Sequence, residues 1–492
     1  MPETEISMSE EILINITPME SRVAVVENGV LQEVHVERTQ RRGIVGNIYK
    51  GKIVRVLPGM QAAFVDIGLS RAAFIHAADI TGREGVTGEG ISGLVHEGQA
   101  LVVQVTKDPI GSKGARLTTN LSIPSRYLVY MPSSSHIGVS LKIEEECERD
   151  RLKQAVTECL ASEGLEDQGG FIIRTATEGA AIEAIMVDIR YLHRLWGQVR
   201  EQMKVCGAPT MIYEELSLPL RTLRDLAAEH TEKVRIDSRE TLQKALQFVG
   251  ELMPEIADRV EHYPGERPIF DLYSIEDEIQ KALERKVPLK SGGHLVIDPT
   301  EAMTTIDVNT GAFVGHRNLE ETVFKTNLEA ALTIARQLRL RNVGGIIIID
   351  FIDMEDEEHR RQVLRTLERQ LERDYAKTNI IGITELGLVQ MTRKRTRESL
   401  AQVLCEPCST CQGRGQVRTA ETICYEIFRE ILREARAFQA DGYMVLASQS
   451  VVDRLLDEES GNVADLESFI GHPVRFQVES MYSQEQYDVV LL

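Results

Sequence analysis

The sequence lacks the features of a membrane-anchored or secreted protein. Its longest apolar runs, such as residues 346–349, fall far short of the ~20 residues that a membrane-spanning helix needs. The first ten residues contain three Glu and neither Lys nor Arg, whereas a secretory signal begins with a basic segment. We therefore expect a protein without a membrane anchor that stays in the cytoplasm.

Cysteine is scarce, with seven in a chain of 492 residues. An odd number of cysteines spread over a long chain argues against a disulfide framework. Three of the seven, Cys405, Cys408 and Cys411, nevertheless fall within seven residues. This crowding needs a separate explanation.

Positive charge is in deficit, because 56 Lys and Arg face 76 Asp and Glu and give a formal net charge of -20. This balance argues against a protein that coats nucleic acid indiscriminately, since counterion release needs clustered positive charge at the contact surface. Net charge does not exclude local basic patches. The densest patch is the basic cluster at residues 393–397.

The apolar pattern predicts several α/β parts. A prior of about 150 residues per domain suggests three or four domains, and a hydrophobic content of 42% supports several cores. Residues 11–37 alternate apolar and polar side chains around the turn Asn28-Gly29, which predicts a β-hairpin. Short β-rich runs between glycine-bearing turns predict a small barrel at residues 43–122, followed by an α/β insertion at 126–219.

Two predicted strands end in an aspartate. Asp307 lies where an extended run gives way to a turn, and Asp350 ends a fully apolar strand. A long helix expected at about 318–341, with Gly344 just past its end, would return the chain so that the two strands lie side by side. Both carboxylates would then lie at one edge of the sheet, with Asn309 facing the same side, as oxygen ligands for Mg²⁺.

A simpler interpretation is that each aspartate caps the turn or helix that follows it, because Asp is a common turn residue. For the pair, the metal interpretation is favoured. Two nearby carboxylates repel each other unless a cation neutralises them, and Asp353 adds a third close by.

The cysteine cluster is a doubled C-x-x-C followed by Gly-Arg-Gly. Thiolates at this spacing can chelate Zn²⁺ as a bidentate clip, but a closed structural site needs four ligands. The chain has no further C-x-x-C, so the remaining ligands would come from a second subunit. Unliganded, reduced cysteines are the alternative.

Two weaker patterns concern phosphate. Arg174 and Thr175 follow a predicted strand, and a guanidinium beside a hydroxyl suits a terminal phosphate, although an exposed edge residue is the more common case. The basic cluster follows the sheet that carries the two aspartates. It is either a solvated face or a group that stabilises charge on the phosphate oxygens.

Aromatic residues in the predicted barrel suggest a third contact. Phe64 and Phe74 lie in different strands, with Lys107 and Lys113 further along. Aromatic faces next to cations on a small barrel are what single-stranded RNA binding requires. Aromatic residues of the barrel core are the usual alternative.

Together these segments resemble the bacterial ribonuclease E/G family over essentially the whole chain. The resemblance is carried by the cysteine cluster and by three motifs, IDVNTG at 306–311, IDFIDM at 349–354 and TELGLVQMTRKR at 384–395. The family's long form continues into an extended disordered scaffold. Because nothing similar follows Leu492, the chain is most like the short form, and we expect no scaffolding role.

The resemblance implies a Mg²⁺-dependent endoribonuclease that cuts single-stranded, AU-rich RNA, is stimulated by a 5′-monophosphate and leaves 5′-phosphate and 3′-hydroxyl ends. It implies roles in rRNA 5′-end maturation and mRNA decay. It also implies a homodimer, or a tetramer of paired dimers, with structural Zn²⁺ between subunits. The alternatives are a non-catalytic RNA-binding ribosome-assembly factor and a metal-dependent DNA nuclease.

The resemblance also assigns residues. Asp307 and Asp350 would bind the catalytic Mg²⁺ with Asn309 as an auxiliary catalytic group. Arg174 and Thr175 match the 5′-phosphate sensor. Cys408 and Cys411 align best with the zinc-binding pair, with Cys405 as a third candidate. Pattern and resemblance together give as RNA-binding residues Phe64, Phe74, Lys107, Lys113, Arg393, Lys394, Arg395 and Arg397.

The implied fold class is a multidomain α/β protein. The expected parts are a ribonuclease H-like subdomain in two pieces (1–38 and 220–283), an S1 (OB-fold) RNA-binding barrel (39–125), an α/β 5′-sensor domain (126–219), a DNase I-like catalytic α/β domain (284–403), a zinc link (404–416) and a small C-terminal α/β domain (417–492).

Overall fold

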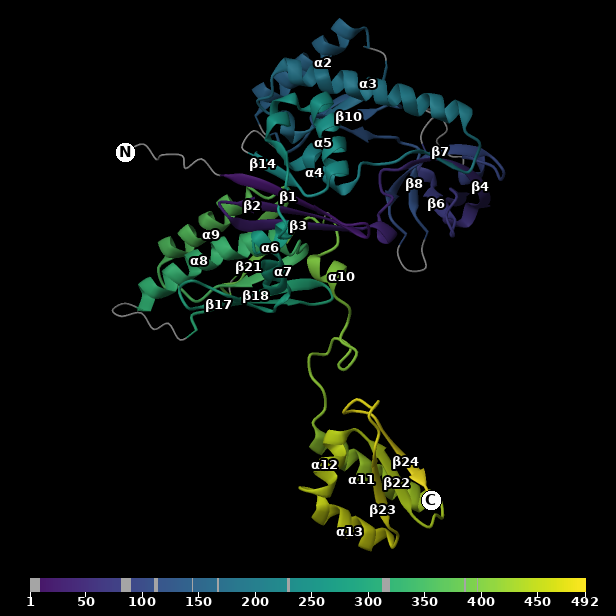
Figure 1. The fold of residues 1–492 in the computed structure, drawn as a ribbon, viewed down its shortest axis with the longest axis vertical. Helices are drawn as coiled ribbons and strands as arrows, with labels where there is room; N and C mark the ends of the chain where they lie inside the picture. The colour runs from purple at the N-terminus through teal and green to yellow at the C-terminus, as the bar shows by residue number, and fades with distance from the viewer. Residues whose placement is uncertain are drawn as a thin grey trace. The chain divides into compact units, whose positions relative to one another are not determined.

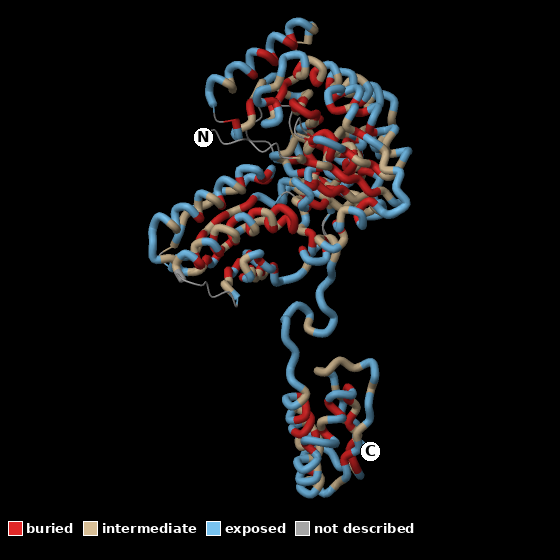
Figure 2. The backbone as a smooth tube through the Cα atoms, turned by 60° about the vertical axis from the view of Figure 1, so that its left-hand side comes forward, coloured by how far each residue is buried: buried red, intermediate tan, exposed pale blue. Residues whose placement is uncertain are grey.

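The computed structural model describes residues 9–492 except 81–89, 110–113, 144, 166–167, 228–230, 312–318, 385 and 396. The chain divides into two compact units, Met1–Val403 and Leu404–Leu492. Each unit has its own buried core, as Figure 2 shows. None of the helices in the described part of the chain is long and apolar enough to cross a bilayer.

A five-stranded sheet joins the first strands of the chain to strands more than 200 residues later, in the order β15-β14-β1-β2-β3. Its members are β1 (Glu10–Ile16), β2 (Glu20–Glu27), β3 (Val30–Arg38), β14 (Thr231–Ile236) and β15 (Val260–His262). The predicted hairpin is confirmed as β2–β3, with positive φ at Asn28 and Gly29 in the turn. Helices α4 (Leu218–Leu226) and α5 (Arg239–Leu252) pack on this sheet.

The predicted small barrel is also confirmed. Its strands are β4 (Ile48–Leu57), β5 (Ala62–Asp66), β6 (Ala73–His76), β7 (Ala100–Lys107) and β8 (Arg116–Thr118), with a short helix α1 (Ile91–Leu94). They follow the order β4-β5-β6-β8-β7, and pairing of β4 with β7 closes the ring (Figure 1). Strand β13 (Thr210–Tyr213) also pairs with β4, in antiparallel orientation.

The α/β insertion between the barrel and α4 is a four-stranded sheet with two helices. Its elements are β9 (Ile123–Pro124), β10 (Leu128–Met131), β11 (Ile137–Val139), α2 (Glu146–Glu163), β12 (Gly170–Ile173) and α3 (Ile182–Val205). Apolar side chains of α2 and α3 form one core with β10 and β12. Short 3₁₀ turns lie at Thr39–Arg41, Pro58–Met60, Ala77–Asp79, Thr175–Thr177 and Pro254–Arg259.

The sheet that carries the two aspartates has six strands in the order β16-β17-β18-β19-β21-β20. They are β16 (Lys286–Pro288), β17 (His294–Pro299), β18 (Met303–Asn309), β19 (Gly345–Asp350), β20 (Thr378–Ile383) and β21 (Val389–Arg393). Helices α8 (Leu319–Leu340) and α9 (Glu357–Leu371) pack on one face, as Figure 1 shows. Helices α6 (Ile269–Leu272), α7 (Ile275–Leu283) and α10 (Leu400–Leu404) complete this unit.

The end of α8 differs from the prediction. The left-handed residue is Asn342, with φ of 48°, and the Val343 N–H donates to the Leu338 carbonyl at 3.0 Å. This bond and the positive φ form a Schellman-type end in which Asn takes the position that glycine usually occupies. Gly344 is needed for another reason, because a Cβ there would lie 3.0 Å from the Arg395 Cα.

The C-terminal unit is a three-stranded sheet in the order β23-β22-β24, packed against helices. Its elements are α11 (Ala420–Ala437), β22 (Tyr443–Ala447), α12 (Gln449–Leu456), α13 (Ser460–Ile470), β23 (Val474–Val478) and β24 (Tyr487–Leu491). The end of the chain is thus a mixed α/β fold, as expected.

A buried ion pair fixes the end of β21. Arg393 is 5% exposed, and its Nε and Nη2 donate to the Asp374 carboxylate at 2.6 and 3.1 Å. Its Nη1 donates to the Val343 carbonyl at 2.9 Å, which ties β21 to the end of α8. Removing one partner of such a pair leaves the other charged and buried, which is far more costly than losing a surface pair.

We therefore expect Arg393→Gln to lower the free energy of unfolding by about 3 kcal/mol, because Asp374 would stay buried without its cation. Chemical denaturation followed by fluorescence or circular dichroism measures this change. Lys394→Gln, at the exposed neighbouring position, is the matched control and should leave stability unchanged. Equal stability of the two variants would show that the ion pair does not hold β21.

Candidate active site and nucleic-acid interface

Asp307 and Asp350 lie side by side because their strands pair in parallel. In the β18–β19 ladder the register partner of Asp307 is Asp350. Neighbouring residues Ile306 and Ile349 are buried against the helices, so the alternation of side chains along a strand turns both aspartates to the opposite face. Strands in a sheet lie about 4.8 Å apart, which brings the two carboxylates onto the same small area.

The electrostatics of this area favour a cation. Burial together with the charges of Asp307 and Asp353 raises the pKa of Asp350 above the usual range of an aspartate. The Asn309 side-chain amide donates to Asp307 Oδ2 at 2.8 Å, which orients that carboxylate and leaves its other oxygen available. Carboxylate and amide oxygens are the ligands that Mg²⁺ uses in proteins, so the donor set fits this ion.

The face that carries the aspartates is accessible. Large apolar side chains stay exposed along it, among them Met303 and, at 47% exposed, Ile346. Met303 and Ile346 are themselves register partners, at the far end of the same two strands. The carboxylates therefore lie at one end of an open surface, which a long polymer could reach without entering a closed pocket.

A second set of ligand-type side chains lies on the helices. Within the described ranges, Glu320, Asp356 and His359 are the one set of three whose ligand atoms all lie within 4.8 Å of one another. The His359 ring stacks on Phe324 with 4.0 Å between centroids. No sequence motif indicated this set, because its members come from the starts of two helices that are distant in the chain.

The two barrel phenylalanines are not core residues. Phe64 and Phe74 are register partners on β5 and β6, and both are half-buried. The neighbours of each along its strand, Val65 and Ile75 among them, fill the barrel core. Both aromatic rings therefore belong to the outer face of the barrel.

Basic side chains lie in register with the two phenylalanines on the neighbouring strands, so that together they form a row across the barrel. Arg55 on β4 is the register partner of Phe64, Arg116 on β8 that of Phe74, and Lys107 on β7 that of Arg116. Arg116 is held by Asp79 at 2.9 Å, whereas Arg55 and Lys107 are exposed. No sequence pattern indicated Arg55 or Arg116, because the register between strands decides which residues lie next to each other. Lys113, also predicted here, lies outside the described residues.

The guanidinium of Arg174 is already positioned by two acceptors. Its Nη2 donates to Asp225 Oδ1 at 2.8 Å, and its Nη1 donates to the Ser125 carbonyl. Thr175 lies in the turn that follows, with its hydroxyl 3.2 Å from the Ser140 hydroxyl. Arg174 is thus a held cation with part of its surface exposed, and not a loose residue at a sheet edge.

A buried carboxylate supports this arrangement. Asp188 on α3 accepts hydrogen bonds from the Ser125 hydroxyl at 2.6 Å and from the backbone N–H groups of Tyr127 and Leu128 at 3.1 and 2.9 Å. Burial raises the pKa of Asp188 to about 6. These bonds hold the segment whose Ser125 carbonyl accepts from Arg174. No local sequence pattern identified Asp188 or Asp225.

The basic cluster at 393–397 does not act as one surface. Lys394 and Arg395 are exposed, and Arg397 contacts the His35 ring and lies 3.8 Å from Glu33. The expectation that Arg393 contacts RNA is contradicted, since its guanidinium is buried in the ion pair with Asp374.

The position of the basic cluster also contradicts the expectation that it stabilises charge on the scissile phosphate. Arg393 pairs with Gly345, at the start of β19, whereas Asp350 ends that strand. Five residues of extended chain separate the two places by about 16 Å. The cluster is therefore too far from the aspartates to neutralise charge on the same phosphate.

Two of the three clustered cysteines, Cys408 and Cys411, take part in a turn of the C-terminal unit, and Cys405 precedes it. The Gln412 N–H donates to the Cys408 carbonyl at 2.7 Å, and the Arg414 N–H to the Cys411 carbonyl at 2.9 Å. Backbone N–H groups of Cys411 and Thr410 point at the Cys408 sulfur and lower its pKa. A thiol that ionises more easily is a better metal ligand. None of the seven cysteines forms a disulfide within the chain.

Sequence comparisons place these sites in a known family. The model of the Ribonuclease E/G family matches residues 122–396, and that of the RNase E/G, Thioredoxin-like domain matches residues 407–491. The C-terminal unit is therefore thioredoxin-like.

Curated relatives agree with both matches. Ribonuclease G of Salmonella typhimurium is 57% identical, covering 99% of this chain and 100% of the relative, and Ribonuclease G of Haemophilus influenzae is 54% identical, covering 98% and 99%. Ribonuclease E of Escherichia coli is 36% identical over 93% of this chain and 44% of its own length. The resemblance seen in the motifs is thus confirmed, and the chain belongs to the ribonuclease E/G family.

Proposed function

We propose that the chain is an endoribonuclease that hydrolyses single-stranded RNA with a Mg²⁺ ion held between Asp307 and Asp350. The names of its relatives support the activity. The observation that carries the site is the parallel register of β18 and β19, which directs both carboxylates to one accessible face. A protein that only bound RNA would gain nothing from this repulsive pair.

The chemistry follows from the donor set. Mg²⁺ bound by the two carboxylates would polarise a phosphate oxygen and lower the pKa of a bound water. Asn309 holds Asp307 in a fixed orientation through its side-chain amide. No side chain needs to bond to phosphorus: water forms the new P–O bond, the P–O3′ bond breaks and the 3′ oxygen takes a proton. The products then carry a 5′-phosphate and a 3′-hydroxyl.

Asp350→Asn should lower cleavage of a short 5′-monophosphorylated RNA by about 10²–10⁴-fold, because a metal ligand is worth several kcal/mol in the transition state. Addition of a chelator to the unmodified chain should have the same effect. Product ends are read by electrophoresis, and RNA binding by fluorescence anisotropy.

Asp298→Asn is the matched control, because Asp298 lies in the same sheet but pairs with Arg285. It should keep full activity. An Asp350→Asn variant that cleaves at the normal rate would remove the metal assignment.

The outer face of the barrel is proposed as the contact for the RNA chain. Phe64 and Phe74 lie in register on neighbouring strands and can stack bases, while Arg55 and Lys107 supply positive charge at the two ends of their row. Because stacking is available to every base, such a face binds single strands with little sequence preference. The exposed Lys394 and Arg395, together with Arg397, are proposed as further RNA contacts away from the cleaved bond.

Arg174 and Thr175 are proposed to sense a 5′-monophosphate. Arg174→Gln should slow cleavage of 5′-monophosphorylated RNA and leave 5′-hydroxyl RNA unaffected, because only the first substrate offers a dianion to the guanidinium. Initial rates on the two substrates measure this selectivity. Arg190→Gln, an exposed position in the same domain, should change neither rate. Equal slowing of both substrates by Arg174→Gln would rule out a sensor.

The cysteine turn is proposed to bind structural Zn²⁺ shared by two chains of a homodimer. Cys408 and Cys411 are the favoured pair, since the turn directs backbone N–H groups at the Cys408 sulfur. Cys408→Ser or Cys411→Ser should then abolish one zinc ion per two chains and shift the mass in solution to that of the single chain. Cys405→Ser should change neither zinc content nor mass, and loss of zinc in that variant would reassign the pair.

The remaining assignments are also proposals. The sheet of β1–β3, β14 and β15 would be the ribonuclease H-like subdomain, residues 39–125 the S1 barrel and 126–219 the 5′-sensor domain. Residues 284–403 would be the DNase I-like catalytic domain and 404–416 the zinc link. Roles in rRNA maturation and mRNA decay are proposed from the family resemblance. Cleavage of RNA substrates from cells would test them.

A further inference from the structure

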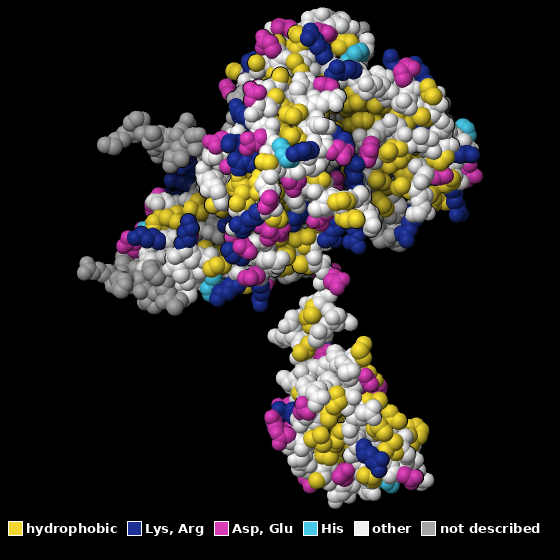
Figure 3. All heavy atoms as spheres, viewed as in Figure 1, with side chains coloured by type: hydrophobic (Ala, Val, Ile, Leu, Met, Phe, Trp, Pro, Cys, Tyr) yellow, Lys and Arg dark blue, Asp and Glu magenta, His cyan; other side chains and the backbone are white. Residues whose placement is uncertain are grey.

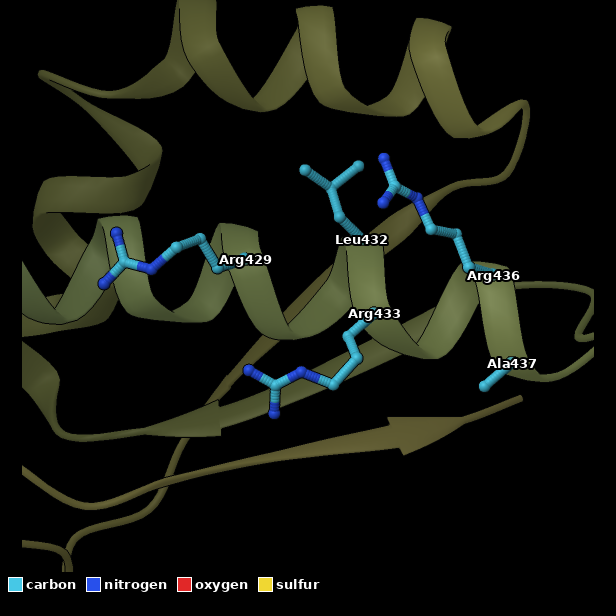
Figure 4. Close-up of a pocket in the computed structure, with 5 residues that line it drawn as sticks. All are labelled: Arg429, Leu432, Arg433, Arg436 and Ala437. Atoms are coloured by element: carbon cyan, nitrogen blue, oxygen red, sulfur yellow. The ribbon is translucent and has the colours of Figure 1, made fainter.

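The exposed side of α11 in the C-terminal unit carries an arginine-lined hollow of about 430 Å³. Arg429, Arg433 and Arg436 surround Leu432, with Ala437 at one end (Figure 4). Their three side chains point in different directions from the helix, which spreads the guanidinium groups over the surface. All three arginines are exposed. We call this surface the α11 basic face.

The charge of this face contrasts with that of its unit. Residues 404–492 contain seven Arg and no Lys against fifteen Asp and Glu. Few basic side chains are visible among the acidic ones on the side of this unit seen in Figure 3. The α11 basic face is therefore a local positive patch on a negatively charged body.

Most other arginines of this unit are neutralised by neighbours. Arg414 and Arg418 both pair with Glu485, and Arg454 pairs with Glu458. On the α11 basic face only Arg433 has an ion pair within the fully described C-terminal unit, with Glu430, and its side chain is still 70% exposed. The charges of Arg429 and Arg436 are thus available to an external anion.

Aromatic side chains flank the arginines. Tyr425, one turn before Arg429, is 43% exposed, and Phe438, just after the helix, is 57% exposed. The opposite side of α11 is buried in the core through Ile423, Ile427 and Ile431. The helix repeat of 3.6 residues puts Tyr425 on the same side as the arginines.

We propose that the α11 basic face is an additional binding site for single-stranded RNA, distinct from the aspartate pair, from the barrel and from the other contacts proposed above. Guanidinium forks bind phosphate oxygens in a bidentate manner, and exposed aromatic rings stack on unpaired bases. The proposal rests on the proposed function in one respect: RNA is the polyanion that the protein handles. The site would hold RNA without reading its sequence.

The test uses the full-length chain in the presence of a chelator, so that no RNA is cleaved. Binding of a fluorescent, unstructured RNA of about 30 nucleotides is followed by anisotropy over a range of salt concentrations. The variant Arg429→Gln/Arg433→Gln/Arg436→Gln should bind about tenfold more weakly at low salt. In a plot of log affinity against log salt concentration, the slope of this variant should be smaller in magnitude by about 2. Each lost phosphate contact contributes about 0.7 to that slope for a single strand.

The control variant Arg361→Gln/Arg365→Gln/Arg369→Gln removes three exposed arginines from α9 at similar helical spacing. Glutamine is a good helix former, so both variants should fold, as thermal denaturation can verify. With Mg²⁺ present, the α11 variant should have the kcat of the unmodified chain and a higher KM for the same RNA.

Four results would overturn the proposal. If the α11 variant has the affinity and salt slope of the unmodified chain, RNA does not bind to this face. The nuclease assignment would then remain intact, because the unmodified chain still binds RNA. An equal loss in both variants would indicate a general charge effect. Unchanged RNA binding with a lower mass in solution would assign the face to contact with acidic residues of a second copy. Failure of the unmodified chain to bind RNA would contradict both this site and the proposed function.

Discussion

The repulsion between Asp307 and Asp350 is the constraint around which the larger unit is organised. The parallel pairing of β18 with β19 makes these residues register partners, and α8 is the crossover that makes a parallel pairing possible. Burial of Ile306 and Ile349 under the helices then turns both charges to the open face. Burial of the apolar face thus holds together two charged groups that would separate in solution, and the divalent cation proposed above would find its two carboxylate ligands already in place.

Much of this architecture could be predicted from the sequence. Alternation and turn residues located the first hairpin, the spacing of short strands located the barrel, and the apolar run before Asp350 located β19. These signals are local, because they depend on residues close together in the chain. The pairing of Asp307 with Asp350 could be predicted for the same reason, since a single helix between two strands leaves little choice of topology.

What could not be predicted depends on register and burial between distant segments. Arg55 joins the aromatic row only because β4 pairs with β5 in one particular register, and Asp225 reaches Arg174 from 51 residues away. Arg393 looked like a surface cation, but alternation along β21 turns it inward to Asp374. At the end of α8 the left-handed position is occupied by Asn342, although glycine was expected there. The sequence does not decide between them, because asparagine also adopts the left-handed conformation.

The partners of Arg174 determine how any anion can be recognised there. The guanidinium already faces the carboxylate of Asp225, which Arg224 also binds through two hydrogen bonds at 3.1 and 3.0 Å. The phosphate proposed to bind here would therefore have to share Arg174 with Asp225 or displace that carboxylate. Arg224 can keep Asp225 neutralised during that exchange. The proposed 5′-phosphate would thus compete with the Asp225 carboxylate for the Arg174 guanidinium, and a doubly charged phosphate would compete better than a singly charged group.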